Sequence, residues 1–311
     1  VDFAAMQGWK QTVVDKLAGG VGKLLKANKV DVVAGRGFFL NAHEVRVEGT
    51  YGTHRYGFEN CIIATGTRPL PHPDLPFDGE RVIMAVSALK LTNIPNQICI
   101  VGSNSIAAEL ATLFAQLGSN VRLLLPEGET LLSEFDLTAG RLIGSGLKKL
   151  GVKLQTATEP VEAATAKEPL IVVCGASRGN TDELALEAVG LTAGDDGFLS
   201  INAQMQTAQP HVYAVGDVTG SGWATVAIKQ GKVAAEAIRG LPVAFAPQAL
   251  PRVAWTTPEV ATVGVSKAEA ERLGYMVKQG RYPLGGNGRS LTLNEPAGTM
   301  LLVAEAESEL L

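Results

Sequence analysis

A strand, a glycine turn, a helix and a second strand follow one another in residues 97–125, and this unit constrains the fold most. The apolar run Ile98–Val101 leads to Gly102, then to a helical pattern over Ile106–Leu117 and to a second apolar run, Val121–Leu125. This is the βαβ unit of a mononucleotide-binding half, and it requires parallel strands. We therefore expect an α/β fold.

The turn of this unit, residues 102–107, reads GSNSIA, one step from the G-x-G-x-x-[GA] pattern of dinucleotide-binding folds. Asn104 stands where a second glycine normally lets the backbone approach a pyrophosphate. The helix N-terminus still offers N–H groups to a phosphate. The acid that would hold ribose hydroxyls is displaced, because Leu125 and Pro126 precede Glu127. Two interpretations stay open, a weak nucleotide site and a scaffold that has lost its site.

Two further apolar strands end in turns of the kind that bind ligands. Residues 61–66 read CIIATG, and residues 212–217 read VYAVGD. A strand that ends in Gly-Asp places a carboxylate at the carboxyl edge of a sheet, where ligands of open α/β folds bind. Asp217 is therefore expected to accept hydrogen bonds from the hydroxyl groups of a ribitol chain.

The remaining elements follow from hydrophobic periodicity. We expect a helix over residues 3–27 that Gly19-Gly20 interrupts, and further helices over residues 138–150, 226–239 and 267–273. Short strands are expected at residues 30–33, 37–40, 44–47, 54–58, 152–155 and 170–174. Residues 300–311 read as a strand with nothing to pair it, and both ends of the chain look cut, so we expect a fragment or part of a longer protein.

Composition argues against several classes of function. The net charge of −4 and the pI near 5.7 favour neither nucleic acid nor an anionic membrane as a partner. No apolar run approaches the roughly 18 residues that a membrane span needs. Cys61, Cys99 and Cys174 lie far apart in apolar runs, as buried thiols of an intracellular protein do. No metal-ligand spacing occurs, so no metal is expected.

The order of these motifs resembles that of flavoprotein disulfide reductases with two dinucleotide-binding domains. Several longer segments are similar to dihydrolipoamide dehydrogenases in particular: residues 9–35, 180–191, 230–240, 256–274 and 287–295. The mercuric and glutathione reductases of the same family remain alternatives. The resemblance implies two Rossmann-like domains, with residues 1–90 and 191–246 in an incomplete FAD domain, residues 91–190 in an inserted NAD domain, and residues 247–311 at the start of an α+β interface domain.

The resemblance also implies a homodimeric enzyme in which FAD passes electrons between a cysteine pair and NAD. The residues carried over to FAD are Ala64, Thr65, Gly66, Gly216 and Asp217. Those carried over to NAD are Gly102, Ile106, Ala107, Glu109 and Gly175, and the turn sequence itself adds Asn104 and Glu127 as candidates for the same site. A 2-oxo acid dehydrogenase or another lipoyl-bearing protein is the expected partner, in the cytoplasm or in an organelle matrix or stroma.

The chain also departs from this family. It contains neither the C-x-x-x-x-C pair nor the first G-x-G-x-x-G motif nor the C-terminal His-Glu pair, so no catalytic residue is assigned. The full-length protein is expected to be an NAD-dependent enzyme, whereas this chain alone is expected to be inactive. A non-catalytic, degenerate paralogue that keeps the fold for a binding or structural role is the alternative.

Overall fold

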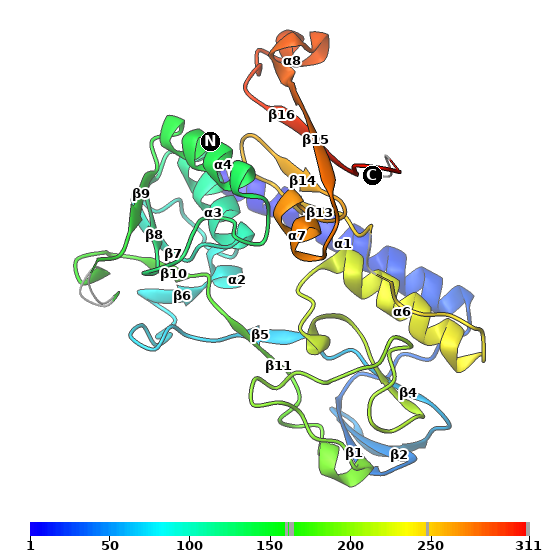
Figure 1. Cartoon of the computed structure of the whole chain (residues 1–311). Coiled ribbons are helices and arrows are strands. Elements are labelled where there is room, and N and C mark those ends of the chain that lie inside the picture. Colours follow the sequence, from blue (N-terminus) through cyan, green and yellow to red (C-terminus); the bar gives the residue numbers. More distant parts are fainter. Residues whose placement is uncertain (159–160, 162–164, 247–248, 309–311) are drawn as a thin grey trace. The chain divides into compact units, whose positions relative to one another are not determined.

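The computed structural model describes residues 1–158, 161, 165–246 and 249–308. The chain forms two compact units, and Figure 1 labels most of their helices and strands. Unit 1 comprises residues 1–70 and 176–247, and unit 2 comprises residues 71–175 and 248–311. The expected start of the interface segment, residue 247, lies outside the described residues.

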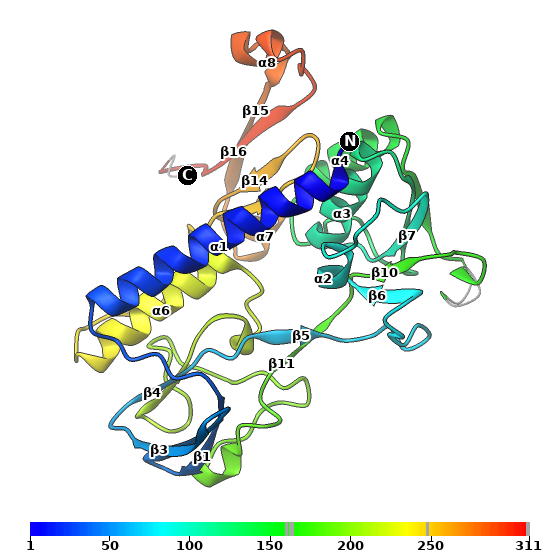
Figure 2. The same ribbon diagram turned by 180° about the vertical axis from the view of Figure 1, so that it is seen from behind.

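Unit 1 begins with the long helix α1 (Phe3–Ala27), which has the predicted bounds. Its N-terminus is capped by Asp2, whose carboxylate accepts a hydrogen bond of 2.9 Å from the Ala5 N–H. The expected interruption at Gly19-Gly20 is wrong, because the helix is continuous there (Figure 2). None of its residues is buried, and Trp9 is 70% exposed.

The predicted strands at residues 37–40, 44–47 and 54–58 are confirmed, and they form an antiparallel sheet in unit 1. Its strands are β1 (Arg36–Asn41), β2 (Glu44–Gly49) and β3 (Gly52–Gly57), in that order in the sheet. The predicted strand at residues 30–33 is wrong, since these residues form no strand and all four are exposed. Valine favours strands only where a neighbouring strand and a packed face exist, and this segment has neither.

The rest of unit 1 is built around short strand pairs. Strand β4 (Cys61–Ile63) runs parallel to β12 (Val212–Ala214), and β5 (Thr67–Pro69) runs antiparallel to β11 (Ser177–Gly179). Between and after them come the 3-10 turns η1 (Leu186–Val189) and η2 (Gly216–Thr219) and the helix α6 (Ala224–Ile238). Apolar side chains of β1, β4, β12 and the two turns form the core.

Unit 2 contains the expected parallel sheet, with the strand order β6-β10-β7-β8-β9. The strands are β6 (Val82–Met84), β10 (Ile171–Val173), β7 (Gln97–Val101), β8 (Asn120–Leu125) and β9 (Lys153–Thr156). The helices are α2 (Ala85–Ala88), α3 (Ser105–Gln116) and α4 (Leu137–Lys149). The edge strand β6 was not expected, because three apolar residues carry no readable period.

The C-terminal part of unit 2 is a series of small elements. They are β13 (Arg252–Ala254), β14 (Val260–Thr262), α7 (Lys267–Arg272), β15 (Val277–Pro283), η3 (Leu284–Gly286), α8 (Gly288–Thr292) and β16 (Thr299–Glu305). The prediction that residues 300–311 lack a partner strand is wrong, since β16 pairs with all seven residues of β15. The sequence of β15, VKQGRYP, is largely polar and lacks the apolar alternation that would predict a strand.

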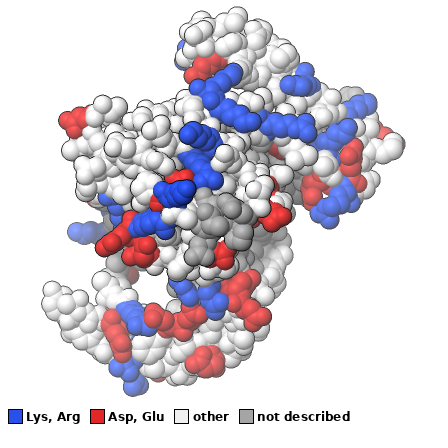
Figure 3. Space-filling view, turned by 90° about the vertical axis from the view of Figure 1, so that its left-hand side faces the viewer, with Lys and Arg blue, Asp and Glu red and all other residues white. Residues whose placement is uncertain are grey.

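Basic and acidic side chains are interspersed on the face shown in Figure 3. Within the described ranges, no helix combines the length and the apolar character that crossing a membrane requires.

Candidate functional site

The A-T-G turn after β4 and the Gly-Asp turn after β12 lie side by side, because β4 and β12 are neighbouring parallel strands. Ala214 is aligned with Ile63, and the Val215 N–H donates to the Ile63 carbonyl over 3.0 Å. Both strands therefore end at one edge, which we call the unit 1 edge and define as residues 64–66 and 216–217. Ala64 and Thr65 are exposed there, whereas Gly66 and Asp217 are half-buried.

A buried network fixes the Gly-Asp turn. Gly216 has a φ of +74°, in the left-handed region that favours glycine. Its N–H donates to Gln230 Oε1 over 2.7 Å, and Gln230 Nε2 donates to Thr219 Oγ1 over 3.2 Å. The Thr219 hydroxyl donates in turn to the Gly216 carbonyl over 2.8 Å. The turn that presents Asp217 is thus held from the buried face of α6.

Two polar groups of this turn lack partners within the described part of the chain. In the described part of the chain, the Asp217 carboxylate has no hydrogen-bond or ion-pair partner. The Ser221 hydroxyl, four residues later, is buried and also lacks a partner among the described atoms. A buried hydroxyl without a partner is unfavourable, so an external group that bonds to it would stabilise the turn. These features fit a polyhydroxyl ligand at the unit 1 edge.

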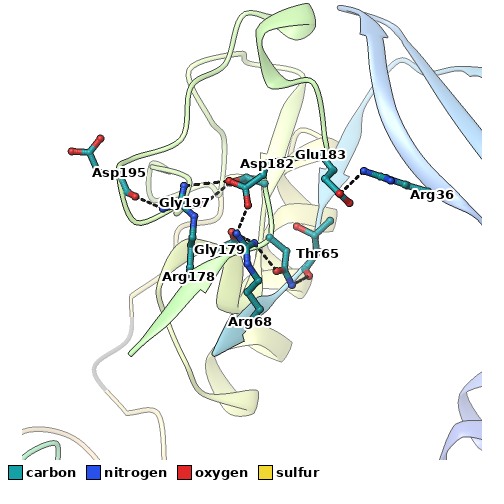
Figure 4. Close-up of polar contacts among 11 residues, drawn as sticks. Arg36, Thr65, Arg68, Arg178, Gly179, Asp182, Glu183, Asp195 and Gly197 are labelled. Atoms are coloured by element: carbon teal, nitrogen blue, oxygen red, sulfur yellow. Dashed lines mark hydrogen bonds and ion pairs between the residues drawn. The ribbon is translucent and has the colours of Figure 1, made fainter. Parts of the chain in front are cut away.

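A polar cluster fixes the A-T-G turn, residues 64–66 of the unit 1 edge (Figure 4). Its members are Arg68, Arg178, Asn180 and Asp182. Asn180 donates from Nδ2 to the Thr65 carbonyl over 3.1 Å and from its N–H to the Gly66 carbonyl over 3.0 Å. Arg68 Nη1 donates to Asn180 Oδ1 over 3.2 Å, and Arg68 also pairs with Asp182. The cluster therefore sets the backbone of the A-T-G turn.

Asp182 joins two cations in this cluster. It accepts from Arg68 and, over 3.2 Å, from Arg178 Nη2. These hydrogen bonds, that from Arg68 first, lower the pKa of Asp182. Sequence reasoning missed this cluster, because its members are brought together only by the pairing of β5 with β11. No local period signals that pairing.

The glycine turn of unit 2 owes its shape to Gly102. This residue has a φ of +147°, and a Cβ added to it would lie 2.3 Å from the Cys174 carbonyl oxygen. The turn after β7 therefore touches the end of β10, where the strand order of the sheet reverses. Gly175 lies at the same edge, but a Cβ there would make only an ordinary contact, 3.8 Å from Val173 Cγ1.

Asn104 has a structural role that the motif comparison did not reveal. It is the N-cap of α3 in an extended conformation, with a φ of −78°. Its Oδ1 accepts from the Ala107 N–H over 3.0 Å, and its Nδ2 donates to the Cys174 carbonyl over 3.2 Å. The side chain thus caps the helix and ties it to the end of β10. Ile106, two residues on, is 49% exposed.

Three of the acids near this turn, Glu109, Glu127 and Glu134, are placed differently. Glu109 Oε1 accepts a hydrogen bond of 2.9 Å from the backbone N–H of Trp255. Glu127 is exposed, and its carboxylate has no hydrogen bond or ion pair with another described residue. Glu134, which sequence reasoning did not single out, accepts from the Ser105 N–H over 2.6 Å. A carboxylate of the chain itself therefore occupies the first turn of α3.

The three cysteines offer no reactive pair. All are free thiols: Cys61 lies in β4 of unit 1, whereas Cys99 and Cys174 lie in or next to strands of unit 2. Burial raises the pKa of Cys99 and of Cys174 to about 12, and it also raises the pKa of Cys61. Among the described residues no group of three His, Cys, Asp or Glu side chains has the geometry to hold a metal.

These raised values predict a loss of stability at alkaline pH. Burial raises the pKa of Cys99 and of Cys174 from about 9.0 in an unfolded chain to about 12, so the stability that these protonated thiols contribute is complete below pH 9 and is lost between pH 9 and about 12. We expect urea unfolding to show this decrease in the free energy of unfolding. A variant with Cys99→Ala and Cys174→Ala should show a smaller decrease over the same range. An equal decrease in both proteins would contradict the burial of these thiols.

Comparison with known proteins gives a consistent picture. Residues 2–234 match the family model described as "Pyridine nucleotide-disulphide oxidoreductase", and residues 250–311 match the model of its dimerisation domain. The dihydrolipoyl dehydrogenase of Bacillus subtilis (strain 168) is 37% identical over 329 residues, which cover 100% of this chain and 70% of that protein. That of Geobacillus stearothermophilus is 37% identical over 325 residues, covering 99% and 69%.

Solved structures share the fold. LpdA from Mycobacterium tuberculosis matches with a TM-score of 0.90 at 23% identity, covering 99% of this chain and 72% of that one. The HOCl-induced flavoprotein disulfide reductase RclA from Escherichia coli matches with a TM-score of 0.84 at 21% identity, covering 98% and 73%. At these identities the likeness concerns the fold alone.

Proposed function

Because this chain belongs to the pyridine nucleotide-disulphide oxidoreductase family, we propose that it is the cofactor-binding part of a dihydrolipoyl dehydrogenase. The family consists of enzymes that use FAD and NAD. The lipoamide branch is favoured over mercuric or glutathione reductases, since relatives named dihydrolipoyl dehydrogenase are 35–37% identical over the whole chain. We assign the flavin to unit 1 and the nicotinamide nucleotide to unit 2.

The observation that carries the flavin assignment is the unit 1 edge. Asn180 holds the backbone of Thr65 and Gly66 next to the Gly-Asp turn. The Asp217 carboxylate of that turn has no hydrogen-bond or ion-pair partner among the described residues. When bound, FAD supplies a two-electron carrier between a dithiol and a nicotinamide. The Asp217 carboxylate would accept hydrogen bonds from its ribitol hydroxyls. Ala64, Thr65 and Gly66 would lie along the flavin, and at Gly66 an added Cβ would meet nothing within 4 Å.

The nucleotide assignment relies on the glycine turn of unit 2. Gly102, Ala107 and Gly175 gather at the sheet edge where the strand order reverses, which is where such folds bind dinucleotides. Residues 126–129 after β8 include two acids and no cation, so NAD is favoured over a nucleotide with a 2′-phosphate. Glu127 is the acid nearest in sequence to the place of a ribose ligand.

The partner assignments follow from the same family membership. Residues 250–311 belong to a dimerisation domain, which supports a homodimer. A lipoyl-bearing protein, such as a 2-oxo acid dehydrogenase complex, would supply the dithiol. The corresponding location is the cytoplasm or an organelle matrix or stroma.

A second candidate is a paralogue that keeps the fold but does not transfer hydride. The contact of Glu134 with the first turn of α3 favours it, because this carboxylate lies where a nucleotide phosphate would bind. The two candidates differ in whether the protein, loaded with FAD and supplied with a dithiol, reduces NAD.

The flavin assignment predicts that Asp217→Ala lowers FAD affinity. Losing a charged acceptor for a buried hydroxyl should cost about 1.5–3 kcal/mol, a loss of roughly tenfold or more in affinity. Thermal unfolding should hardly change, since Asp217 has no side-chain partner among the described residues. Quenching of FAD fluorescence measures the affinity. Asp195→Asn removes an exposed charge from the same unit as a control, and equal affinities in all three proteins would exclude Asp217 from the site.

A further inference from the structure

The loop between β8 and α4, residues 126–136, is acidic and closely attached to the glycine turn of unit 2. It contains four acids, Glu127, Glu129, Glu134 and Asp136, and no Lys or Arg. We call it the acidic loop. A loop of this charge would repel the phosphates of a dinucleotide if it lay in their place.

Three hydrogen bonds attach the acidic loop to the turn that precedes α3. The Leu132 N–H donates to the Ser103 carbonyl over 2.7 Å, and the Ser103 hydroxyl donates to the Glu129 carboxylate. The Ser105 N–H donates to Glu134 Oε1 over 2.6 Å. Leu132 is 1% exposed, so an apolar anchor holds the loop in addition to these polar contacts.

Glu134 accepts a hydrogen bond from the Ser105 N–H, which is one of the groups that a bound phosphate would contact. The first N–H groups of a helix have no partner within the helix, and they bind anions together with the positive end of the helix dipole. In α3, Asn104 takes the Ala107 N–H and Glu134 takes the Ser105 N–H. One oxygen atom at 2.6 Å from the Ser105 nitrogen excludes another acceptor from that position.

The residues of unit 2, as folded, therefore do not fit a bound dinucleotide. We infer that Glu134 is an internal competitor for the phosphate-binding end of α3, so that a nicotinamide nucleotide binds only when the acidic loop moves away. This inference rests on the nucleotide assignment made above, and it makes Glu134 a residue that sets nucleotide affinity.

Removing the competitor should strengthen nucleotide binding. Glu134→Ala is expected to lower the Kd for NAD by about tenfold, the effect of one anion at a partly buried helix N-terminus. Glu134→Gln keeps a neutral acceptor for the Ser105 N–H, so its Kd should lie between those of wild type and Glu134→Ala. Asp136→Asn removes a charge from the same loop and keeps an N-cap for α4, where Asp136 accepts from the Thr138 N–H, so it should not strengthen binding.

Calorimetric titration of the full chain with NAD measures these constants. If Asp136→Asn strengthens binding as much as Glu134→Ala, loop charge alone is responsible and the inference fails. Binding by Glu134→Ala and Glu134→Gln that is no tighter than wild type overturns it as well, and so does a lack of binding by every variant. Flavin retention is independent of these outcomes, so the flavin assignment is judged separately.

Hydrogen exchange gives a second readout that needs no turnover. In Glu134→Ala without nucleotide, the Ser105 amide should exchange faster than in wild type, because its acceptor is gone. Saturating NAD should speed exchange of the Leu132 amide in the wild-type chain, because this amide donates to the Ser103 carbonyl only while the acidic loop is attached to the turn. A Leu132 amide that stays protected in NAD-saturated wild type would show that the nucleotide binds without loop displacement, and would overturn the inference.

Discussion

NADH formation from dihydrolipoamide and NAD is expected to stay at background when this 311-residue chain is assayed alone with added FAD. The reaction needs a thiolate that attacks and a second thiol close enough to form a disulfide. Cys61 belongs to unit 1, whereas Cys99 and Cys174 belong to unit 2, and all three are free. With a pKa of about 12, each of the unit 2 thiols is almost wholly protonated at neutral pH.

The absorbance of NADH measures this directly. A variant with Ser in place of Cys61, Cys99 and Cys174 serves as the matched control, because it keeps the chain but removes every thiol. Turnover that rises with the concentration of the wild-type chain and disappears in this variant would contradict the prediction. An intact dihydrolipoyl dehydrogenase, assayed in parallel, shows that the substrates are competent.

Gly102→Ala is expected to destabilise unit 2 by about 3 kcal/mol or more, the combined cost of a strained backbone and of overpacking. Residues with a Cβ rarely adopt the backbone φ of +147° that Gly102 has. The new Cβ would lie 2.3 Å from a backbone oxygen, that of Cys174, which no rotamer change can relieve. The turn or the end of β10 must therefore shift, and nucleotide binding should weaken with it.

Gly118→Ala is the matched control for this substitution. Gly118 follows the other end of α3, also with a positive φ, of +94°, but a Cβ there meets nothing within 4 Å. Its cost should be limited to backbone strain, about 1 kcal/mol. Urea unfolding of both variants gives the comparison. Equal losses of stability would show that steric overlap at Gly102 contributes nothing.

Sequence patterns predicted the parts of the fold whose signal is local. The unit from β7 to β8 and the helix α1 have nearly the expected bounds, because each repeats its apolar residues with a clear period. Residues 30–33 show the limit of this approach, since β-branched residues there have no strand to pair with. The pairing of β15 with β16 was missed for the opposite reason, a polar strand with a long connection.

The candidate sites were predictable to a similar extent. The Gly-Asp and A-T-G turns were expected at sheet edges, and the parallel pair β4 and β12 brings them together. The roles of Asn180 and Glu134 depend on contacts between residues 29 or more positions apart, such as that between Ser105 and Glu134. No motif records such contacts, and only the folded backbone brings these residues together.

Crystals of the chain grown with saturating FAD test the assignment of the flavin to the unit 1 edge most directly. The predicted result is a flavin next to Ala64, Thr65 and Gly66, with ribitol hydroxyls within hydrogen-bond distance of the Asp217 carboxylate. Flavin bound away from these residues, or a unit 1 edge that stays free of flavin at saturation, would contradict the assignment.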